Sequence, residues 1–353
     1  MGTKFNRTYV LAVQCGEYYT RQLVNGEQTI EFFPGKKQVV INPFFTINFK
    51  INRGIYATTN DISIDIYNLN KQTREALYYD PILFGAVGKN ITFFCGYSPE
   101  TTLSQFSNGV IFQDYDEGFK YKNKSVPLIF SGRVIRCYSY RKGVDFITHI
   151  EAYDLPERNE INLQTSYPMG TNVKEVIVDI ADKLGINKER VHISSTFGLK
   201  RFEREKTFNN AKAWDVLQSL VDSENENIRN KAGNNVPQYN LFYDLNDLYI
   251  MKTDEMNEDR MVNVSADTGL LETPIRENSV VRFKMLFEPM FRCGGCVNLY
   301  SRTTQTGISG KMQVVGFVHK GTVSPVYCGE LTTELTCFLG LEPLKMAEYV
   351  EIV

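Results

Sequence analysis

The sequence lacks the features that mark several common protein classes. It has one tryptophan and three histidines, and 39 lysines and arginines against 41 aspartates and glutamates leave a formal net charge of -2. This balance gives no overall field that would attract nucleic acid or anionic lipid. No apolar run approaches the roughly 18 residues of a membrane-spanning helix, and the apolar stretch from Tyr9 to Val13 is too short for a signal peptide. Asn6 occupies the position where myristoylation requires Ser or Thr. We therefore expect no stable membrane association.

Cysteine is also sparse, with seven residues and no dense framework of pairs. An odd, scattered set predicts reduced thiols in a protein made in a cytosol. At roughly 150 residues per domain, the length predicts about two to three domains. A hydrophobic fraction of 42% is enough to bury ordinary cores.

The residues that are abundant favour β structure. Phenylalanine and tyrosine, 23 and 20 residues, suit pleated and half-buried surfaces. Apolar and polar residues alternate from Phe45 to Ile51 and again from Ile62 to Ile66, which predicts two strands with one buried face each. The segment from Asn52 to Asp61 suits a hairpin loop, and Lys71 to Tyr79 is long enough for about two helical turns.

A second β block extends from Asn90 to Asp154. Its clearest part is a long hairpin, Leu128 to Tyr140 and Val144 to Tyr153, which we expect to close a sheet or barrel. Residues 98–125 are rich in Gly, Asn, Asp and Ser and are predicted to be an inserted loop.

The period of the pattern changes in the middle of the chain. Val173 to Leu184 has helical spacing, with Asn172 as its N-cap and Gly185 as its stop. A second helix is expected from Ala211 to Ser223 with Asn210 as its cap.

Polar residues 224–236 are predicted to be a mobile loop, and a hairpin, Gln238 to Tyr243 and Asp247 to Met251, follows it. The strands expected after Gly269 cover residues 279–286, 296–301, 311–320 and 330–338. The last two resemble in layout the hairpin of the first β block. The order along the chain is thus β, then α+β, then β.

Histidines are the first candidates for catalysis. His149, His192 and His319 are far apart in sequence, and no serine or cysteine nucleophile motif accompanies them. We interpret each as a packed or solvated residue.

Cys293-Gly294-Gly295-Cys296 has the spacing of a redox pair or half a zinc site. Only Cys328 and Cys337 follow as further ligands, and the flanking pattern is β, so a simple turn is favoured. The site residues are therefore predicted as none: no catalytic, cofactor-binding or metal-binding set.

Carboxylates give no sharper signal. Asp254, Glu255, Glu258 and Asp259 lack the spacing of a calcium loop and are expected to form a solvated surface loop. The charge-mixed run from Lys200 to Lys206 is also expected to be solvated, and no phosphate-binding glycine motif occurs. Paired glycosidase carboxylates have no fixed spacing, so a hydrolase stays open.

Three stretches resemble the baseplate hub, or tail hub, proteins of tailed bacteriophages. The first extends from Pro43 to Leu69 and on to Thr73-Arg74. The second extends from Phe130-Ser131-Gly132-Arg133-Val134 to Glu151-Ala152-Tyr153-Asp154. The third combines Leu270-Leu271-Glu272-Thr273-Pro274 with His319-Lys320-Gly321 and the segment from Glu330 to Leu335. The resemblance implies an α+β, mostly β chain with two tail-tube-like antiparallel β-barrels flanking small α+β domains. The expected divisions are residues 1–155, 156–268 and 269–353.

The resemblance also implies a function. Such a hub is a homotrimeric, pseudo-sixfold ring that joins the hexameric tail tube to the trimeric central spike and lets DNA pass. Its partners would be further copies of itself, the tail tube or distal tube protein, the spike, other baseplate proteins and the tape measure protein, with DNA only in transit. It would be made in the host cytoplasm, reside in the virion and need no cofactor.

Two departures and two alternatives accompany this resemblance. The segments 98–125 and 224–236 match no family role, and neither a cell-wall-degrading segment nor a needle-like spike is present in the 353 residues.

One alternative is a β-rich tail protein that binds glycans or hydrolyses cell walls with exposed aromatics and paired carboxylates. The other is an interaction scaffold unrelated to phage.

Overall fold

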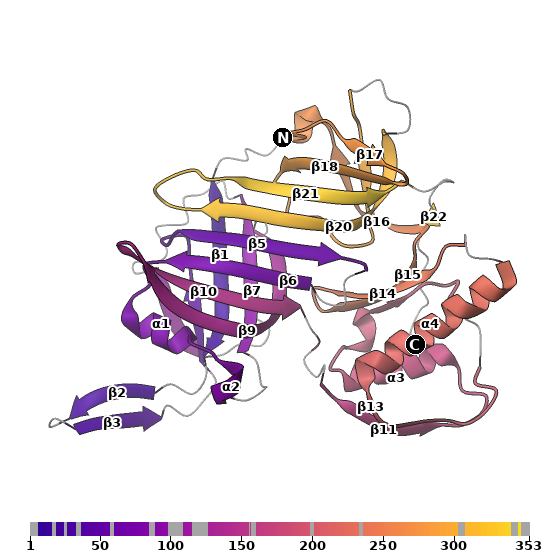
Figure 1. Ribbon diagram of the computed structural model, residues 1–353, viewed down its shortest axis with the longest axis horizontal. Coiled ribbons are helices and arrows are strands. Elements are labelled where there is room, and N and C mark those ends of the chain that lie inside the picture. The colour runs from indigo at the N-terminus through magenta and orange to yellow at the C-terminus, as the bar shows by residue number, and fades with distance from the viewer. Residues whose placement is uncertain are drawn as a thin grey trace.

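The computed structural model describes residues 6–15, 19–24, 27–32, 37–56, 60–84, 89–97, 109–114, 126–154, 156, 160–197, 201–232, 236–302, 308–339 and 345–346. One large sheet dominates it, and a smaller region with helices α3 and α4 lies beside one end of that sheet (Figure 1). The chain is thus mostly β with an α+β part, as the sequence predicted.

The large sheet has 15 strands, and its main path follows the order β17-β18-β21-β20-β5-β6-β10-β9-β7-β1-β4-β8. Strands β16, β19 and β22 branch from this path. The strands of the first part are β1 (Arg7–Cys15), β4 (Lys37–Ile41), β5 (Ile47–Gly54), β6 (Asn60–Tyr67), β7 (Lys89–Tyr97), β8 (Val110–Asp114), β9 (Leu128–Lys142) and β10 (Asp145–Asp154). Those of the last part are β16 (Glu255–Val264), β17 (Ile275–Glu277), β18 (Val280–Leu286), β19 (Gly295–Leu299), β20 (Gly310–Val323), β21 (Leu331–Phe338) and β22 (Lys345–Met346).

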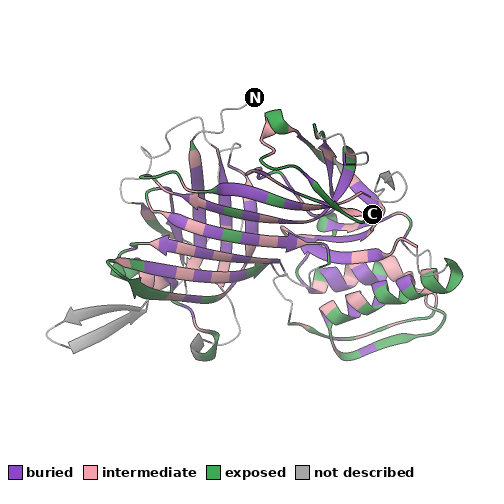
Figure 2. Cartoon of the chain, turned by 45° about the horizontal axis from the view of Figure 1, so that its top comes forward, coloured by how far each residue is buried: buried purple, intermediate pink, exposed green. Residues whose placement is uncertain are grey.

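Alternation along the strands decides which face of the sheet is buried. In β5 and β6 every second residue is buried, and the residues between are partly or fully exposed, so bands of burial cross the strands (Figure 2). The pairing is antiparallel, with Phe49 opposite Ile64. This confirms both predicted strands and their hairpin. The buried residues join those of β1, β4, β7, β9 and β10 in one core.

Helix α1 (Lys71–Leu77) follows β6, as expected. Asn70 caps it by accepting a hydrogen bond from the Thr73 N–H at 2.8 Å, and Leu77 is fully buried. Lys89 Nζ donates to the carbonyl oxygens of Ala76 and Tyr78 at the other end, which holds the helix against β7. A short helix, α2 (Pro81–Phe84), comes next.

Residues 98–125 are not entirely a loop. Strand β8 lies within them and pairs with β4 at the edge of the sheet, while residues 98–108 and 115–125 lie outside the described part. The prediction also missed β1, β4 and the hairpin of β2 (Tyr19–Val24) and β3 (Glu27–Phe32). The run from Tyr9 to Val13 carries the signal for β1, because a strand buried on both faces has no alternation.

The middle region has its own core between helices and two small sheets. Its elements are β11 (Asn162–Tyr167), α3 (Val173–Lys183), a 3-10 turn (Lys188–Arg190), β12 (Val191–Ile193), β13 (Lys206–Lys212), α4 (Ala213–Ala232), β14 (Tyr239–Asp244) and β15 (Asp247–Lys252). Helix α3 matches the prediction, with the Asn172 side chain capping the Lys174 N–H and Gly185 in the left-handed region.

Two predictions in this region are wrong. Helix α4 continues to Ala232, through residues expected to form a mobile loop, because Asn225 is buried and exchanges hydrogen bonds with the backbone of Tyr239. Asn210 is not a helix cap. It lies inside β13 with a φ of 53°, next to the point where the pairing of β13 with β11 shifts register.

In the part of the chain that the structure describes, the two β blocks do not form the two separate closed barrels that the resemblance implied. Strand β5 pairs with β6 on one side and with β20 on the other, from Ile47 opposite Val323 to Gly54 opposite Gly316. That pairing occupies the edge that would otherwise close the first block. Within the described residues, no strand ladder closes either half of the sheet, and both halves share one curved surface.

The last part of the sheet matches the predicted strands. Strands β20 and β21 form a long antiparallel hairpin, and β18 pairs with β21. A short 3-10 turn, Ala266–Thr268, precedes them. Strand β16 runs parallel to β19, a pairing that the sequence pattern did not indicate. No helix within the described ranges is both long and apolar enough to cross a bilayer.

Candidate functional site

The outward face of the large sheet carries charges of both signs in close pairs. Lys284 Nζ lies 2.8 Å from Glu330 Oε1, Lys320 Nζ lies 3.5 Å from Glu330 Oε2, and Arg136 Nε lies 3.6 Å from Glu151 Oε2. Arg136 lies directly opposite Glu151 in the pairing of β9 with β10. Glu330 lies just before β21 and contacts Lys284 of β18 and Lys320 of β20, the two strands that flank β21. The face therefore has little net charge locally.

His149 lies between two carboxylates on this face. Its Nδ1 lies 2.6 Å from Asp65 Oδ1, and its Nε2 lies 3.1 Å from Glu151 Oε1. The hydrogen bond to Asp65, followed by that to Glu151, raises the pKa of His149 against the opposing effect of partial burial. Because Arg136 also contacts Glu151, two carboxylates and two basic groups compensate one another. The cluster cross-links β6, β10 and β9, and both histidine nitrogens are engaged.

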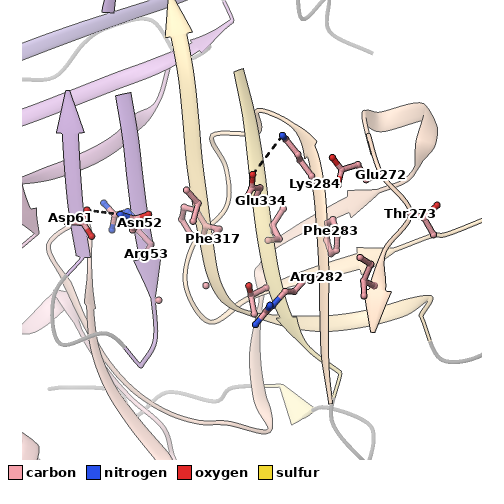
Figure 3. Close-up of a pocket in the computed structure, with 16 residues that line it drawn as sticks. Asn52, Arg53, Asp61, Glu272, Thr273, Arg282, Phe283, Lys284, Phe317 and Glu334 are labelled. Atoms are coloured by element: carbon pink, nitrogen blue, oxygen red, sulfur yellow. Dashed lines mark hydrogen bonds and ion pairs between the residues drawn. The ribbon is translucent and has the colours of Figure 1, made fainter. Parts of the chain in front are cut away.

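A groove of about 620 Å³ opens on the outward face between β5 and β18 (Figure 3). Two of its carboxylates are held by neighbours, since the Asn52 amide donates to Asp61 Oδ2 at 2.7 Å and Lys284 Nζ lies 3.9 Å from Glu334 Oε1. Phe317, one of the residues that line it, has only 3% of its surface exposed. The groove is therefore lined by paired charges.

The other two histidines lie elsewhere. His319 is buried against Phe287 and Phe317, and its Nδ1 lies 2.8 Å from Thr333 Oγ1. Burial lowers the pKa of His319 well below its ordinary value, so it stays neutral in the core. His192 stacks on Tyr249 with 4.7 Å between ring centres. The structure brings none of the three histidines together.

The structure brings two of the four cysteine candidates near each other, since Cys296 adds to the upward shift that burial causes in the pKa of Cys337. Cys293, Cys296 and Cys337 are buried and Cys328 is exposed. Burial raises the pKa of the Cys293 and Cys337 thiols, which makes them poor nucleophiles. Among the residues that the structure describes, no group of three or more His, Cys, Asp or Glu is placed to hold a metal ion.

Three members of the acidic group, Glu255, Glu258 and Asp259, lie in strand β16 rather than on a loop, contrary to the prediction. Glu255 begins β16 and is 5% exposed. Its carboxylate accepts hydrogen bonds from Ser194 and Thr196 hydroxyls at 2.9 and 3.1 Å and from the Lys252 N–H at 3.1 Å. These bonds satisfy a buried carboxylate and connect the middle region to the large sheet.

The sequence reasoning missed a buried charge cluster around Arg53. Its guanidinium donates to Asp154 Oδ2 at 2.8 Å, to Asp244 Oδ1 and to the Ile129 carbonyl at 3.2 Å, and all three side chains are at most 1% exposed. The signal was present, because Arg53 follows Ile47, Phe49 and Ile51 in the buried phase of β5. A charged residue in that phase indicates a buried partner.

Burial and the neighbouring Asp244 raise the pKa of Asp154 to about 6, although Arg53 opposes this shift. One guanidinium between two carboxylates leaves an excess negative charge. The Asp154 Oδ1 atom has no hydrogen-bond partner among the described residues. The cluster therefore binds a proton more readily than an exposed carboxylate would.

Comparison with known proteins gives one family. The family model described as Baseplate hub gp41 matches residues 29–306, more than half of the chain. No curated protein sequence matches.

Solved structures with a similar fold include the 43 kDa tail protein of prophage MuSo2 from Shewanella oneidensis, with a TM-score of 0.52 at 7% identity over 94% of this chain and 97% of that one. The E. coli c3393 protein, a component of the type VI secretion system, gives a TM-score of 0.50 at 6% identity over 87% of this chain and 76% of that one. At such low identity these matches concern the fold.

Proposed function

Because the chain belongs to the baseplate hub gp41 family of structural phage tail proteins, we propose that it forms a homotrimeric, pseudo-sixfold ring. This ring joins the hexameric tail tube to the trimeric central spike in the tail baseplate of the virion. Other baseplate proteins and the tape measure protein are further proposed partners. The chain is made in the host cytoplasm, and its role is structural rather than enzymatic.

The observation that carries this proposal is a pair of equivalent hairpins. The hairpin β9–β10 comes from the first β block and β20–β21 from the last, and β5 and β6 lie between them in one sheet. The turns of both hairpins lie at the same end of the sheet (Figure 1). Three chains would present six such hairpins, which suits a sixfold partner. In the ring each curved half of the sheet would serve as one tube-like unit, with the divisions 1–155, 156–268 and 269–353.

The outward face supports a passage for DNA. Strong duplex binding requires many unpaired cations against the phosphates, whereas Lys284, Lys320 and Arg136 on this face are each matched by a carboxylate. A wall of this kind would let DNA pass without retaining it.

The test is electron microscopy of the purified chain together with its mass in solution. We expect threefold rings with a nearly sixfold outline and a mass of three 40.5 kDa chains. Monomers that persist in the presence of the tail tube and spike proteins would contradict the proposal. So would hydrolysis of cell-wall material by the purified chain.

A further inference from the structure

One end of the large sheet exposes a cluster of large apolar side chains. Val323 lies opposite Ile47, and Ile47 lies opposite Ile66, so the segments beyond these residues leave the sheet at the same end (Figure 1). The exposed residues there form what we call the strand-end surface: Phe44 (53% exposed), Tyr140 (39%), Val144 (86%), Phe146 (38%), Val326 (86%) and Tyr327 (53%).

The strand-end surface is held in place by the chain beneath it. Asn68, at a φ of 59°, donates its N–H to the Phe146 carbonyl at 2.7 Å and accepts from the Phe146 N–H at 3.0 Å. The guanidinium carbons of Arg74 and Arg141 lie 4.1 and 5.9 Å from the centre of the Phe146 ring. An apolar surface that is already ordered loses little conformational entropy when a partner covers it.

The charges around this surface are mainly positive. Arg74, Arg141 and Lys142 enter no ion pair within the described part of the chain. The nearby carboxylates are already engaged. Asp145 accepts a hydrogen bond from the Asn68 amide at 2.8 Å, and Asp65, which adds to the effect of burial in raising the pKa of Tyr140, lies 2.6 Å from His149 Nδ1. Apolar anchors surrounded by arginines are typical of protein interfaces, and the positive charge calls for a partner with carboxylates.

Both β blocks contribute to the strand-end surface. Val144 and Phe146 come from the β9–β10 hairpin, and Val326 and Tyr327 come from the segment between β20 and β21. The middle region with α3 and α4 occurs once per chain and lies toward the other end of the sheet (Figure 1). A trimer thus repeats the hairpin turns six times and the middle region three times.

We propose that the strand-end surface binds the end of the hexameric tail tube, at a face that presents carboxylates around an apolar patch. This proposal rests on the proposed hub function. It assigns one end of the chain to the sixfold partner, and the apolar side chains together with Arg141 and Lys142 make the contact.

Cys328 provides a reporter at this surface. It is exposed in the segment between β20 and β21, and the other six cysteines are buried. A maleimide reagent should therefore react first with Cys328. We expect the purified tail tube protein of the same virion to slow this reaction and the purified spike protein to leave it unchanged.

Two variants and a matched control test the contact. V144D/V326D should weaken binding of the tube protein about tenfold or more, and R141E/K142E should weaken it and reduce its dependence on salt. Met169, which is 72% exposed in the middle region, provides the control M169D, which should bind like the parent. All three changes affect exposed residues, and the mass of each variant shows whether it still assembles.

The outcomes separate the two proposals. Unchanged tube binding by V144D/V326D would overturn the strand-end contact while leaving the hub function intact. Protection of Cys328 by the spike protein or by duplex DNA, but not by the tube protein, would also overturn it. Failure of the parent chain to form trimers or to bind either tail protein would contradict the hub function itself.

Discussion

At the scale of single residues, alternation along a strand decides what each side chain does. Ile64 is fully buried and packs in the core of the first β block, whereas Lys50, on the neighbouring strand, points outward and is exposed. The same alternation places His149 outward, among carboxylates, and His319 inward, among aromatic rings. Identical residue types thus acquire opposite pKa shifts from the face on which they lie.

A charge placed on the buried face should be costly. Ile64→Asp puts a carboxylate into the core without a partner, and we expect it to lower the free energy of unfolding by about 3–5 kcal/mol. Chemical denaturation measures this change. Lys50→Asp introduces the same residue on the outward face and should shift stability by less than about 1 kcal/mol. Equal effects of the two substitutions would show that the register of β5 and β6 is wrong.

At the scale of elements, the turns between strands and the ends of helices depend on backbone conformations that the local sequence pattern predicts only in part. The β14–β15 turn has Leu245 and Asn246 at φ values of 51° and 72°, the geometry that matches the twist of a two-residue hairpin. Its position follows from the predicted hairpin, whose first strand ends at Tyr243 and whose second begins at Asp247. The prediction ended helix α4 at Ser223 because the residues that follow are polar. The helix continues because the buried Asn225 side chain exchanges hydrogen bonds with the backbone of Tyr239.

Asn246 offers a clean test of that turn. N246A and N246G both remove the amide that contacts Ser131 and Tyr243, but only alanine has a Cβ that disfavours a left-handed φ. We expect N246A to be less stable than N246G by about 1 kcal/mol. Thermal unfolding of the pair measures the difference, and greater stability of the alanine variant would contradict the turn geometry.

At the scale of the whole molecule, polar contacts hold the middle region to the large sheet. Arg53 on β5 binds Asp154 at the end of β10 and Asp244 at the end of β14. Asn60 donates to the Tyr243 carbonyl at 2.8 Å, and the Cys293 N–H donates to Asp244 at 3.2 Å. These contacts connect β5 and β10 of the first β block with the β14–β15 hairpin and with Cys293, so the charges at this junction affect how the parts hold together.

Asp154 should make stability depend on pH in an unusual direction. Its pKa is raised to about 6 in the folded chain against an ordinary value of 3.8, so between these values the folded state binds a proton that the unfolded state does not. The parent should therefore gain about 1–3 kcal/mol relative to D154N as pH falls from 8 to 4. Urea unfolding across this range measures the gain. A difference that stays constant with pH, or that grows toward high pH, would contradict it.

The sequence by itself determined the elements whose period is clear. The alternation from Phe45 to Ile51 and from Ile62 to Ile66, the hairpin through Val134 and Ile150, and the helix after Asn172 all occur as predicted. These features depend on neighbours in the chain, whose spacing is visible in the sequence.

Only the tertiary structure decided how these elements combine. The pairing of β5 with β20 merges two expected barrels into one sheet, and the contacts of Arg53 with Asp154 and Asp244 join residues 101 and 191 positions apart. The strand-end surface likewise draws on segments from both β blocks. The physical reason is that a periodic pattern records which face of an element is buried, but not which distant element covers it. That choice depends on long-range packing, which no local spacing encodes.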